Sequence, residues 1–255
     1  MKITSQGMGS SEWGAVAPCK GIGIFGCGRS GTSFLIKILH ANGVYVGNCT
    51  GGTLENLDAR SINDPYLSSH FKAIKNSSMP YGELPNTEIE VLDYAQEKTS
   101  QFANKMNSEC SGKYWGFKDP RTTVLHDMWV KHADYIVGVF RNPHEVAESY
   151  MKLLGVYFDN SSKEQGYEIM LNYWLRLNQS LLHIFKNTDK PKFMLEFNNN
   201  MNEQVNNLFK GLELPKHNNS HDFNALLKHE NKDLNFDTHH KLEETYDKLV
   251  KLKNN

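Results

Sequence analysis

The sequence predicts an α/β protein, a three-layer α/β/α sandwich around a central parallel sheet of about five strands. Five short runs rich in β-branched and aromatic residues show little polar alternation, which is typical of strands buried on both faces. Helical patterns separate these runs, and the repeated strand–helix order indicates right-handed crossovers. The strand runs are 22–25, 44–46, 114–117, 135–140 and 193–197, and the helical stretches are 32–41, 87–109, 123–132, 143–154 and 163–186.

Length and composition favour one folding unit. The chain has 255 residues, of which 39% are hydrophobic and 22% charged. This ordinary globular mixture excludes a collagen-like or wholly disordered protein. We expect a flexible polar arm over residues 1–20 and a single domain over residues 21–255.

Charge and hydropathy exclude several classes of partner. The formal net charge is -1, so no overall positive field would attract nucleic acid or anionic lipid. The longest clean apolar run, 135–140, is far shorter than the roughly 20 residues that span a bilayer. We therefore predict a cytoplasmic protein with no nucleic-acid partner and no membrane partner.

The cysteines and histidines show no metal-binding pattern. Cys19, Cys27, Cys49 and Cys110 form no CxxC pair, so their spacing indicates neither a zinc site nor a disulfide framework. We expect all four to be buried, reduced thiols. The histidines form no HExxH or similar ligand pair, so we predict no metal site.

A glycine-rich segment, GCGRSGTS, runs from Gly26 to Ser33 between the first predicted strand and a helix. Glycines let successive backbone N–H groups turn toward one point, and the following helix N-terminus adds partial positive charge. The segment is therefore suited to hold an anion. As a dinucleotide loop it lacks an acid at the end of the second strand, and as a Walker loop it has Thr32 at the lysine position. Arg29 supplies a cation inside the loop instead.

Charged residues follow the third predicted strand, where its carboxyl end meets the edge that carries the glycine loop. Lys118, Asp119 and Arg121 all lie in this short segment. Ligands gather at such edges of parallel sheets, so these side chains are candidates for an anion site. The alternative is that they only pair with one another.

A second anion pocket is predicted at the end of the fourth strand. Arg141 follows the strand directly, and Pro143 suits the first turn of the next helix. Ser149 then lies on the second turn, from which it can share an anion with Arg141. The alternative for Arg141 is a salt bridge at the start of the helix.

Together these motifs resemble those of the sulfotransferases that use 3′-phosphoadenosine 5′-phosphosulfate (PAPS), most closely the bacterial and tyrosylprotein types. GCGRSGTSF resembles the family's 5′-phosphosulfate loop, VFRNPHEVAESY its 3′-phosphate segment and FKDPR its strand-end motif. The resemblance spans about residues 20–215 and implies a fold like that of the P-loop nucleotide hydrolases. It implies a donor site formed by Gly28, Arg29, Ser30, Gly31, Thr32, Ser33, Phe34, Arg141 and Ser149.

The resemblance implies transfer of a sulfuryl group to a hydroxyl or amine of a small-molecule, glycan or peptide acceptor. Adenosine 3′,5′-bisphosphate would leave, and no metal would be required. Arg29 and Lys118 would neutralise charge at the reacting group. Phe34 stands where cytosolic members have an adenine-stacking Trp, and it either stacks on the base or packs in the core.

The general base has three candidates. Asp119 lies near the position of a His in the cytosolic sulfotransferases, whereas Glu55 and Asp58 follow the first helix, as a Glu does in the tyrosylprotein type. The glycine-rich 3′-phosphate loop of the cytosolic members is missing here. Lys228 or His229 is the candidate replacement for its cations.

Two other functions fit a phosphate-binding loop on this fold. One is a P-loop nucleotide or small-molecule kinase, which would bind Mg-ATP. The other is a catalytically silent nucleotide-binding module, which would bind the bisphosphate without turning over an acceptor.

Overall fold

The computed structural model describes residues 18–68, 89–154, 163–198, 200–215 and 239–254. Most of the predicted arm and both Lys228 and His229 lie outside these ranges. The strands are β1 (Lys20–Gly26), β2 (Cys49–Thr50), β3 (Glu55–Asn56), β4 (Tyr114–Lys118), β5 (Tyr135–Phe140) and β6 (Lys192–Glu196). The α-helices are α1 (Thr32–Ala41), α2 (Leu57–Ser68), α3 (Ile89–Glu109), α4 (Pro120–Val124), α5 (His126–Trp129), α6 (Pro143–Leu154), α7 (Lys163–Asn187), α8 (Met201–Gly211) and α9 (His239–Lys253).

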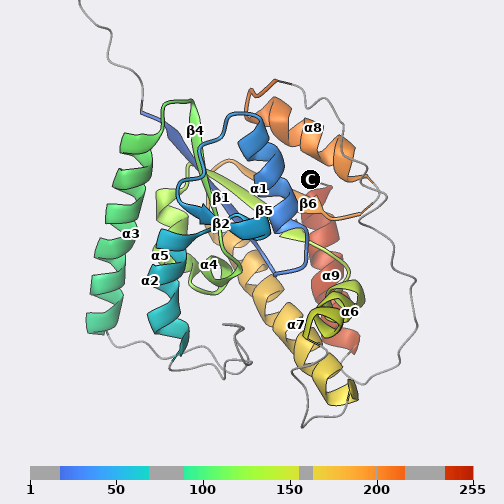
Figure 1. The fold of residues 1–255 in the computed structure, drawn as a ribbon. Helices are drawn as coiled ribbons and strands as arrows, with labels where there is room; N and C mark the ends of the chain where they lie inside the picture. The colour runs from blue at the N-terminus through green and yellow to red at the C-terminus, as the bar shows by residue number, and fades with distance from the viewer. Residues whose placement is uncertain (1–17, 69–88, 155–162, 199, 216–238, 255) are drawn as a thin grey trace, which may run out of the picture.

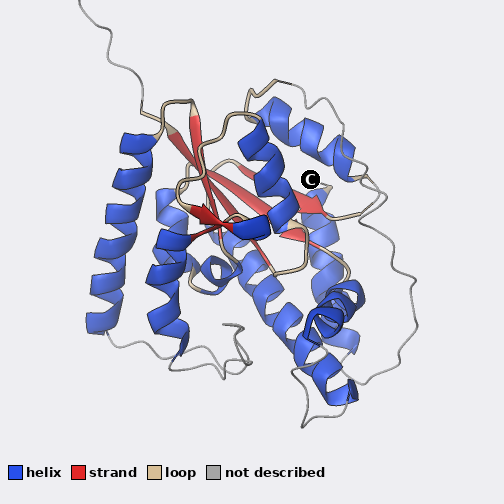
Figure 2. Ribbon diagram, in the orientation of Figure 1, coloured by secondary structure: helices blue, strands red, loops and turns tan. Residues whose placement is uncertain are grey.

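Four parallel strands form the main sheet in the order β4-β1-β5-β6. All four carboxyl ends therefore lie at one edge, where β1 leads into the glycine loop and β4 and β5 lead into the charged segments. A separate antiparallel hairpin, β2-β3, follows α1. Figure 2 shows helices on both sides of the sheet, as an α/β sandwich requires.

Each face of the sheet packs against its own hydrophobic core. Helices α1 and α8 cover one face, over Ile24 and Val139 among others. The other face packs against the larger set that includes α3, α5, α6 and α7, around Phe117, Phe140 and Trp174. Figure 1 shows α2 and α3 beside each other at one end of this layer. Trp174 of α7 is fully buried in this second core.

The predicted strand at 44–46 is wrong, and the main sheet has four strands in place of five. Only Tyr45 pairs with the edge strand β4, as an isolated bridge to Trp115. Tyr45 N–H donates to Tyr114 O, and Gly116 N–H donates to Tyr45 O. Gly47, with φ 68°, then turns the chain away before a longer ladder forms.

The predicted helix at 123–132 is also wrong in its boundaries. Asp119 caps the helix N-terminus by accepting the Arg121 N–H at 2.9 Å, and Pro120 occupies the first turn, so α4 begins three residues earlier. Helix α4 ends at its C-cap, Leu125. Helix α5 and a 3₁₀ turn at Val130–His132 follow. The early cap explains the difference, because it places the first turn directly against the end of β4.

Two of the cysteines are not the reduced thiols that the spacing predicted. Cys19 and Cys110 form a disulfide between the start of β1 and the end of α3. Cys27 and Cys49 are free, and only Cys27 is fully buried. The spacing rule failed because this pair is 91 residues apart and meets only through the fold.

Across the described ranges, no helix combines the length and the apolar character needed to cross a bilayer.

Candidate active site

The glycine loop lies between the end of β1 and the first turn of α1. Thr123 holds the end of the strand, because its hydroxyl accepts the Gly26 N–H at 2.8 Å and donates to Gly26 O at 3.2 Å. Arg29 has a left-handed φ of 65°, and Gly31, at the N-cap of α1, has φ 92°. At Gly31 a Cβ atom would overlap the ring of Phe197, so the turn requires glycine.

Lys118, at the end of β4, reaches toward this loop from a buried position. Its side chain is 2% exposed, and Nζ donates to Ser33 Oγ at 3.0 Å and to Glu55 Oε1 at 3.1 Å. Burial lowers the pKa of Lys118 below the ordinary lysine value, although Glu55 opposes the shift. The loop, β4 and β3 therefore meet at this ammonium group.

Glu55 is held in place by its two neighbours in the β2-β3 hairpin. Leu54 has a left-handed φ of 47°, which is rare for a branched residue and turns the chain sharply just before Glu55. Asn56 is buried, and its Oδ1 accepts the N–H groups of Asp58 and Ala59 at the start of α2. The Glu55 side chain is 23% exposed and faces the site.

Two of the three candidate bases are engaged elsewhere. Asp58 pairs with Lys105 at 2.8 Å. Asp119 is 0% exposed and accepts both the backbone N–H and the Nε–H of Arg121. The alternative that Asp119 and Arg121 pair with each other is thus what the structure shows, and Glu55 is the half-buried acid beside Lys118.

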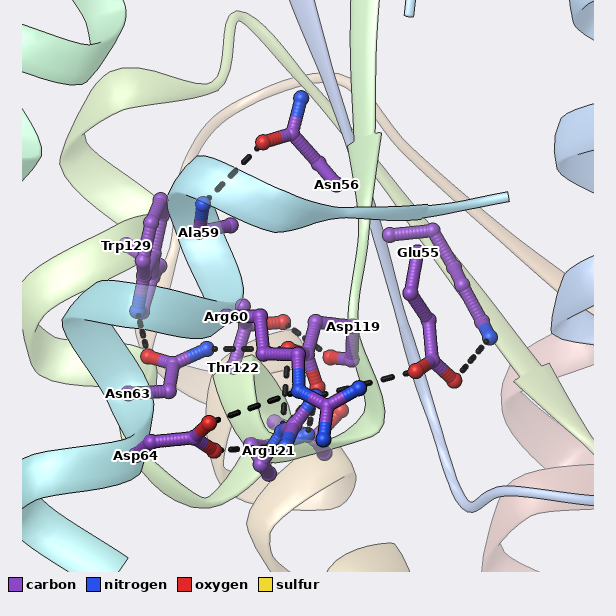
Figure 3. Close-up of polar contacts among 12 residues, drawn as sticks. Glu55, Asn56, Ala59, Arg60, Asn63, Asp64, Asp119, Arg121, Thr122 and Trp129 are labelled. Atoms are coloured by element: carbon purple, nitrogen blue, oxygen red, sulfur yellow. Dashed lines mark hydrogen bonds and ion pairs between the residues drawn. The ribbon is translucent and has the colours of Figure 1, made fainter. Parts of the chain in front are cut away.

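Arg121, one of the charged residues that follow β4, is the centre of a polar network with three carboxylates (Figure 3). Its guanidinium contacts three carboxylates: Asp119 through Nε at 2.8 Å, Asp64 through Nη1 at 2.7 Å and Glu55 through Nη2 at 3.7 Å. Asn63 extends the network into the core, since it accepts from Trp129 Nε1 at 2.9 Å. The FKDPR segment was the available signal, but it did not show which acids would surround the arginine.

A pocket of about 250 Å³ opens between these elements. It brings predicted site residues of the loop, β3 and β4 together with residues of α2, α6 and α7. The residues that line the pocket are Gly28, Arg29, Ser33, Thr53, Glu55, Arg60, Lys118, Asp119, Pro120, Arg121, Tyr150, Leu153 and Tyr173. Arg60, Tyr150 and Tyr173 were not predicted, because they come from helices whose orientation the sequence pattern does not define.

Arg141 and Ser149 lie beside the loop but contact different partners. Arg141 is 4% exposed, and its Nε donates to Glu145 at 2.6 Å, as the salt-bridge alternative predicted. The Ser149 hydroxyl accepts from Arg29 Nε at 2.9 Å and so joins the loop to α6. Arg141 Nη2 is buried and makes no hydrogen bond within the described part of the chain.

The Phe197 side chain contacts both Arg141 and the glycine loop. The Arg141 guanidinium lies over the Phe197 ring, with 5.2 Å to its centroid. The same ring meets Gly31 and packs edge-on against Phe34, with centroids 5.8 Å apart. Phe34 is therefore in a packed, half-buried position in this structure, and its suggested stacking on a base stays a prediction.

Comparison with known proteins gives little beyond this geometry. No protein-family model matches the chain, and no curated protein matches it. Among solved structures, it is similar to the sulfotransferase domain from the curacin biosynthetic pathway, with a TM-score of 0.49 and 14% sequence identity. That match covers 77% of this chain and 75% of the other. Because the similarity is this weak, the function must be inferred from the site itself.

Proposed function

We propose that this protein is a sulfotransferase that moves the sulfuryl group of PAPS to a hydroxyl or amine. The observation that carries the proposal is the buried Arg141 Nη2, a guanidinium nitrogen without a partner in the described chain, close to a glycine loop that holds a second cation. A buried donor without an acceptor is costly, so a site of this kind suits an anion that completes it. Two anion-binding sites, or seats, one at Arg141 and one at the glycine loop, fit a nucleoside with phosphates at its 3′ and 5′ positions.

The loop would hold the 5′-phosphosulfate. Its backbone N–H groups and Arg29 face the anion, and Lys118 approaches from β4, where it is already hydrogen bonded to Ser33 of the loop. Charge that develops on the departing phosphate oxygen would be neutralised by these two cations. Lys118 is placed before reaction by burial and hydrogen bonds, and Arg29 by its hydrogen bond to Ser149, so little rearrangement is needed.

The second seat would hold the 3′-phosphate. Arg141 offers its free Nη2, and the Ser149 hydroxyl keeps its own proton to donate, because its oxygen already accepts from Arg29. Arg29 and Ser149 therefore connect the two seats. The sequence predicted that Arg141 and Ser149 alone would bind one anion. In this arrangement Ser149 would contact the 3′-phosphate and would also accept from Arg29, which binds the 5′ end.

Glu55 is the acid that we assign as general base. The Glu55 side chain is 23% exposed in the pocket, whereas Asp119, which also lines the pocket, is 0% exposed, and Asp58 pairs with Lys105. The acceptor oxygen or nitrogen would bond to sulfur as the bond from sulfur to the bridging oxygen breaks, and Glu55 would receive the acceptor proton. Adenosine 3′,5′-bisphosphate would leave with the bonding electron pair.

A kinase fits the same fold but suits these side chains less well. A kinase needs carboxylates that can bind Mg²⁺ between phosphates. Here Glu55 is paired with Lys118, and Asp119 is paired with Arg121. A donor that requires no metal ion is more compatible with acids already neutralised by cations.

Calorimetry with the full chain in the presence of EDTA tests the proposal. Adenosine 3′,5′-bisphosphate should bind more tightly than ADP, and the Arg141→Ala variant should lose about 1.5–3 kcal/mol of that binding, or about tenfold to a hundredfold in affinity. Adenosine 5′-phosphate, which lacks the 3′-phosphate, is the matched ligand control and should bind both proteins equally. Equal affinity for the bisphosphate and ADP, or binding only with magnesium, would favour the kinase.

The lowered pKa of Lys118 leads to a pH prediction. The ammonium group binds anions only below its pKa, and burial moves that pKa downward. Affinity for adenosine 3′,5′-bisphosphate should therefore fall as the pH rises from neutral to alkaline, before an ordinary lysine would lose its charge. In Lys118→Arg the cation stays charged, so the fall should disappear. Calorimetry across this pH range measures both proteins, and superimposable profiles would contradict the assignment.

A further inference from the structure

Tyr150 is an unassigned pocket residue that lies against the glycine loop. It follows Ser149 on α6, is almost fully buried, and lines the pocket with Gly28, Arg29 and Lys118. At position 28, a Cβ atom would overlap the Tyr150 hydroxyl oxygen. Glycine at this position therefore allows the phenol to reach the loop backbone.

The Tyr150 hydroxyl is available as a donor. Its ring packs edge to face on Tyr173, with centroids 5.6 Å apart. Burial raises both pKa values well above the ordinary tyrosine value, so both groups keep their protons. A phenol that keeps its proton can donate one hydrogen bond to a ligand group.

The position of Tyr150 indicates which part of a bound nucleotide it would meet. Consecutive helix residues point about 100° apart, so Ser149 and Tyr150 face different directions. Ser149 contacts Arg29, whereas Tyr150 faces the cavity that Lys118 and Glu55 also line. In the proposed function this cavity receives the transferring group and the acceptor, beyond the 5′-phosphate.

We propose that Tyr150 donates a hydrogen bond to the sulfuryl group of bound PAPS and thereby distinguishes the donor from its product. This inference rests on the proposed function. Arg29 and Lys118 approach the group from the loop and from β4, and Tyr150 approaches from α6. Adenosine 3′,5′-bisphosphate has no sulfuryl group, so it cannot accept this hydrogen bond.

The test compares two nucleotides on conservative variants, with no acceptor present. Calorimetry with EDTA measures the affinity of the full chain for PAPS and for adenosine 3′,5′-bisphosphate. Tyr150→Phe removes only the hydroxyl, so PAPS should bind about tenfold more weakly, equivalent to about 1.4 kcal/mol, while the bisphosphate changes less than about twofold. Tyr167→Phe, which removes a buried phenol hydroxyl on α7 away from the pocket lining, is the matched control and should keep the ratio of the two affinities within about threefold of wild type.

Each outcome separates this inference from the function on which it rests. If wild type binds both nucleotides but Tyr150→Phe weakens them equally, or weakens neither, the Tyr150 assignment is overturned and the proposed function stands. A Tyr167→Phe variant that loses the ratio as strongly as Tyr150→Phe also overturns it. If wild type binds neither nucleotide, both proposals are wrong. Melting curves of all variants establish that loss of binding is not loss of folding.

Discussion

Replacing Arg121 with Ala is expected to cost about 3–5 kcal/mol of folding free energy. The reason is Asp119, which is 0% exposed and receives two N–H groups of the Arg121 side chain and backbone. Without the guanidinium, a carboxylate would remain enclosed with no cation to balance it. Asp64 and Glu55 would lose a partner too. Urea unfolding, followed by circular dichroism, measures the loss.

Two companion variants show whether burial of the charge is the cause. Arg60→Ala removes an arginine from the same pocket, but this side chain is 43% exposed and lies 3.4 Å from Asp64, so its effect should stay below about 1 kcal/mol. Adding Asp119→Asn to Arg121→Ala should restore part of the stability, because Asn is neutral and still caps a helix. If Arg121→Ala unfolds at the wild-type urea concentration, Asp119 is not the buried, paired acid described above.

This network also explains how Glu55 reaches its position. Arg121 joins α4, α2 and β3 through contacts with Asp119, Asp64 and Glu55. Arg121, which is itself held by Asp119 and Asp64, therefore orients Glu55, the acid assigned as general base. A folded Arg121→Lys variant would keep one cation, but it would lose the planar fork that contacts all three acids.

Reduction of the Cys19–Cys110 disulfide is expected to lower the unfolding free energy by about 2–4 kcal/mol. The bond closes a long loop, with 91 residues of sequence separation, and so restricts the unfolded chain. It lies at the start of β1, whereas the glycine loop follows the end of that strand. Reduction should therefore destabilise the fold without changing the affinity for adenosine 3′,5′-bisphosphate below the melting range.

Unfolding with and without a phosphine reductant measures this effect, and Cys19→Ser should reproduce it. The matched control is Cys49→Ser, since Cys49 is a free, half-buried thiol whose loss should leave the response to reductant intact. An unfolding midpoint that does not respond to reductant, together with four titratable thiols, would disprove the bond. Disulfides persist in oxidising compartments and are uncommon in the cytosol, so this pair does not support the predicted cytoplasmic location.

Sequence patterns predicted those parts of the fold that depend on local periodicity. The buried runs of β1, β4, β5 and β6 and the helices α1, α3, α6 and α7 lie within one or two residues of their predicted ranges. The exceptions are instructive. At 44–46 the apolar run has the right composition, but whether it pairs depends on the turn at Gly47 and on a free edge of β4.

By itself, the sequence determined the four strands of the main sheet, the helices α1, α3, α6 and α7, and a glycine turn with Arg29 after the first strand. These features depend on residues close together in the chain, whose preferences act wherever the segment lies. Only the tertiary structure decided that Glu55, and not Asp119 or Asp58, faces Lys118, and that Ser149 contacts Arg29. Each of those pairings joins residues about 50 or more positions apart in the sequence. No local sequence pattern around an arginine or a carboxylate predicts which residue it will pair with. Which charged side chains form pairs depends on which of them the fold buries close together, and that is a property of the folded chain.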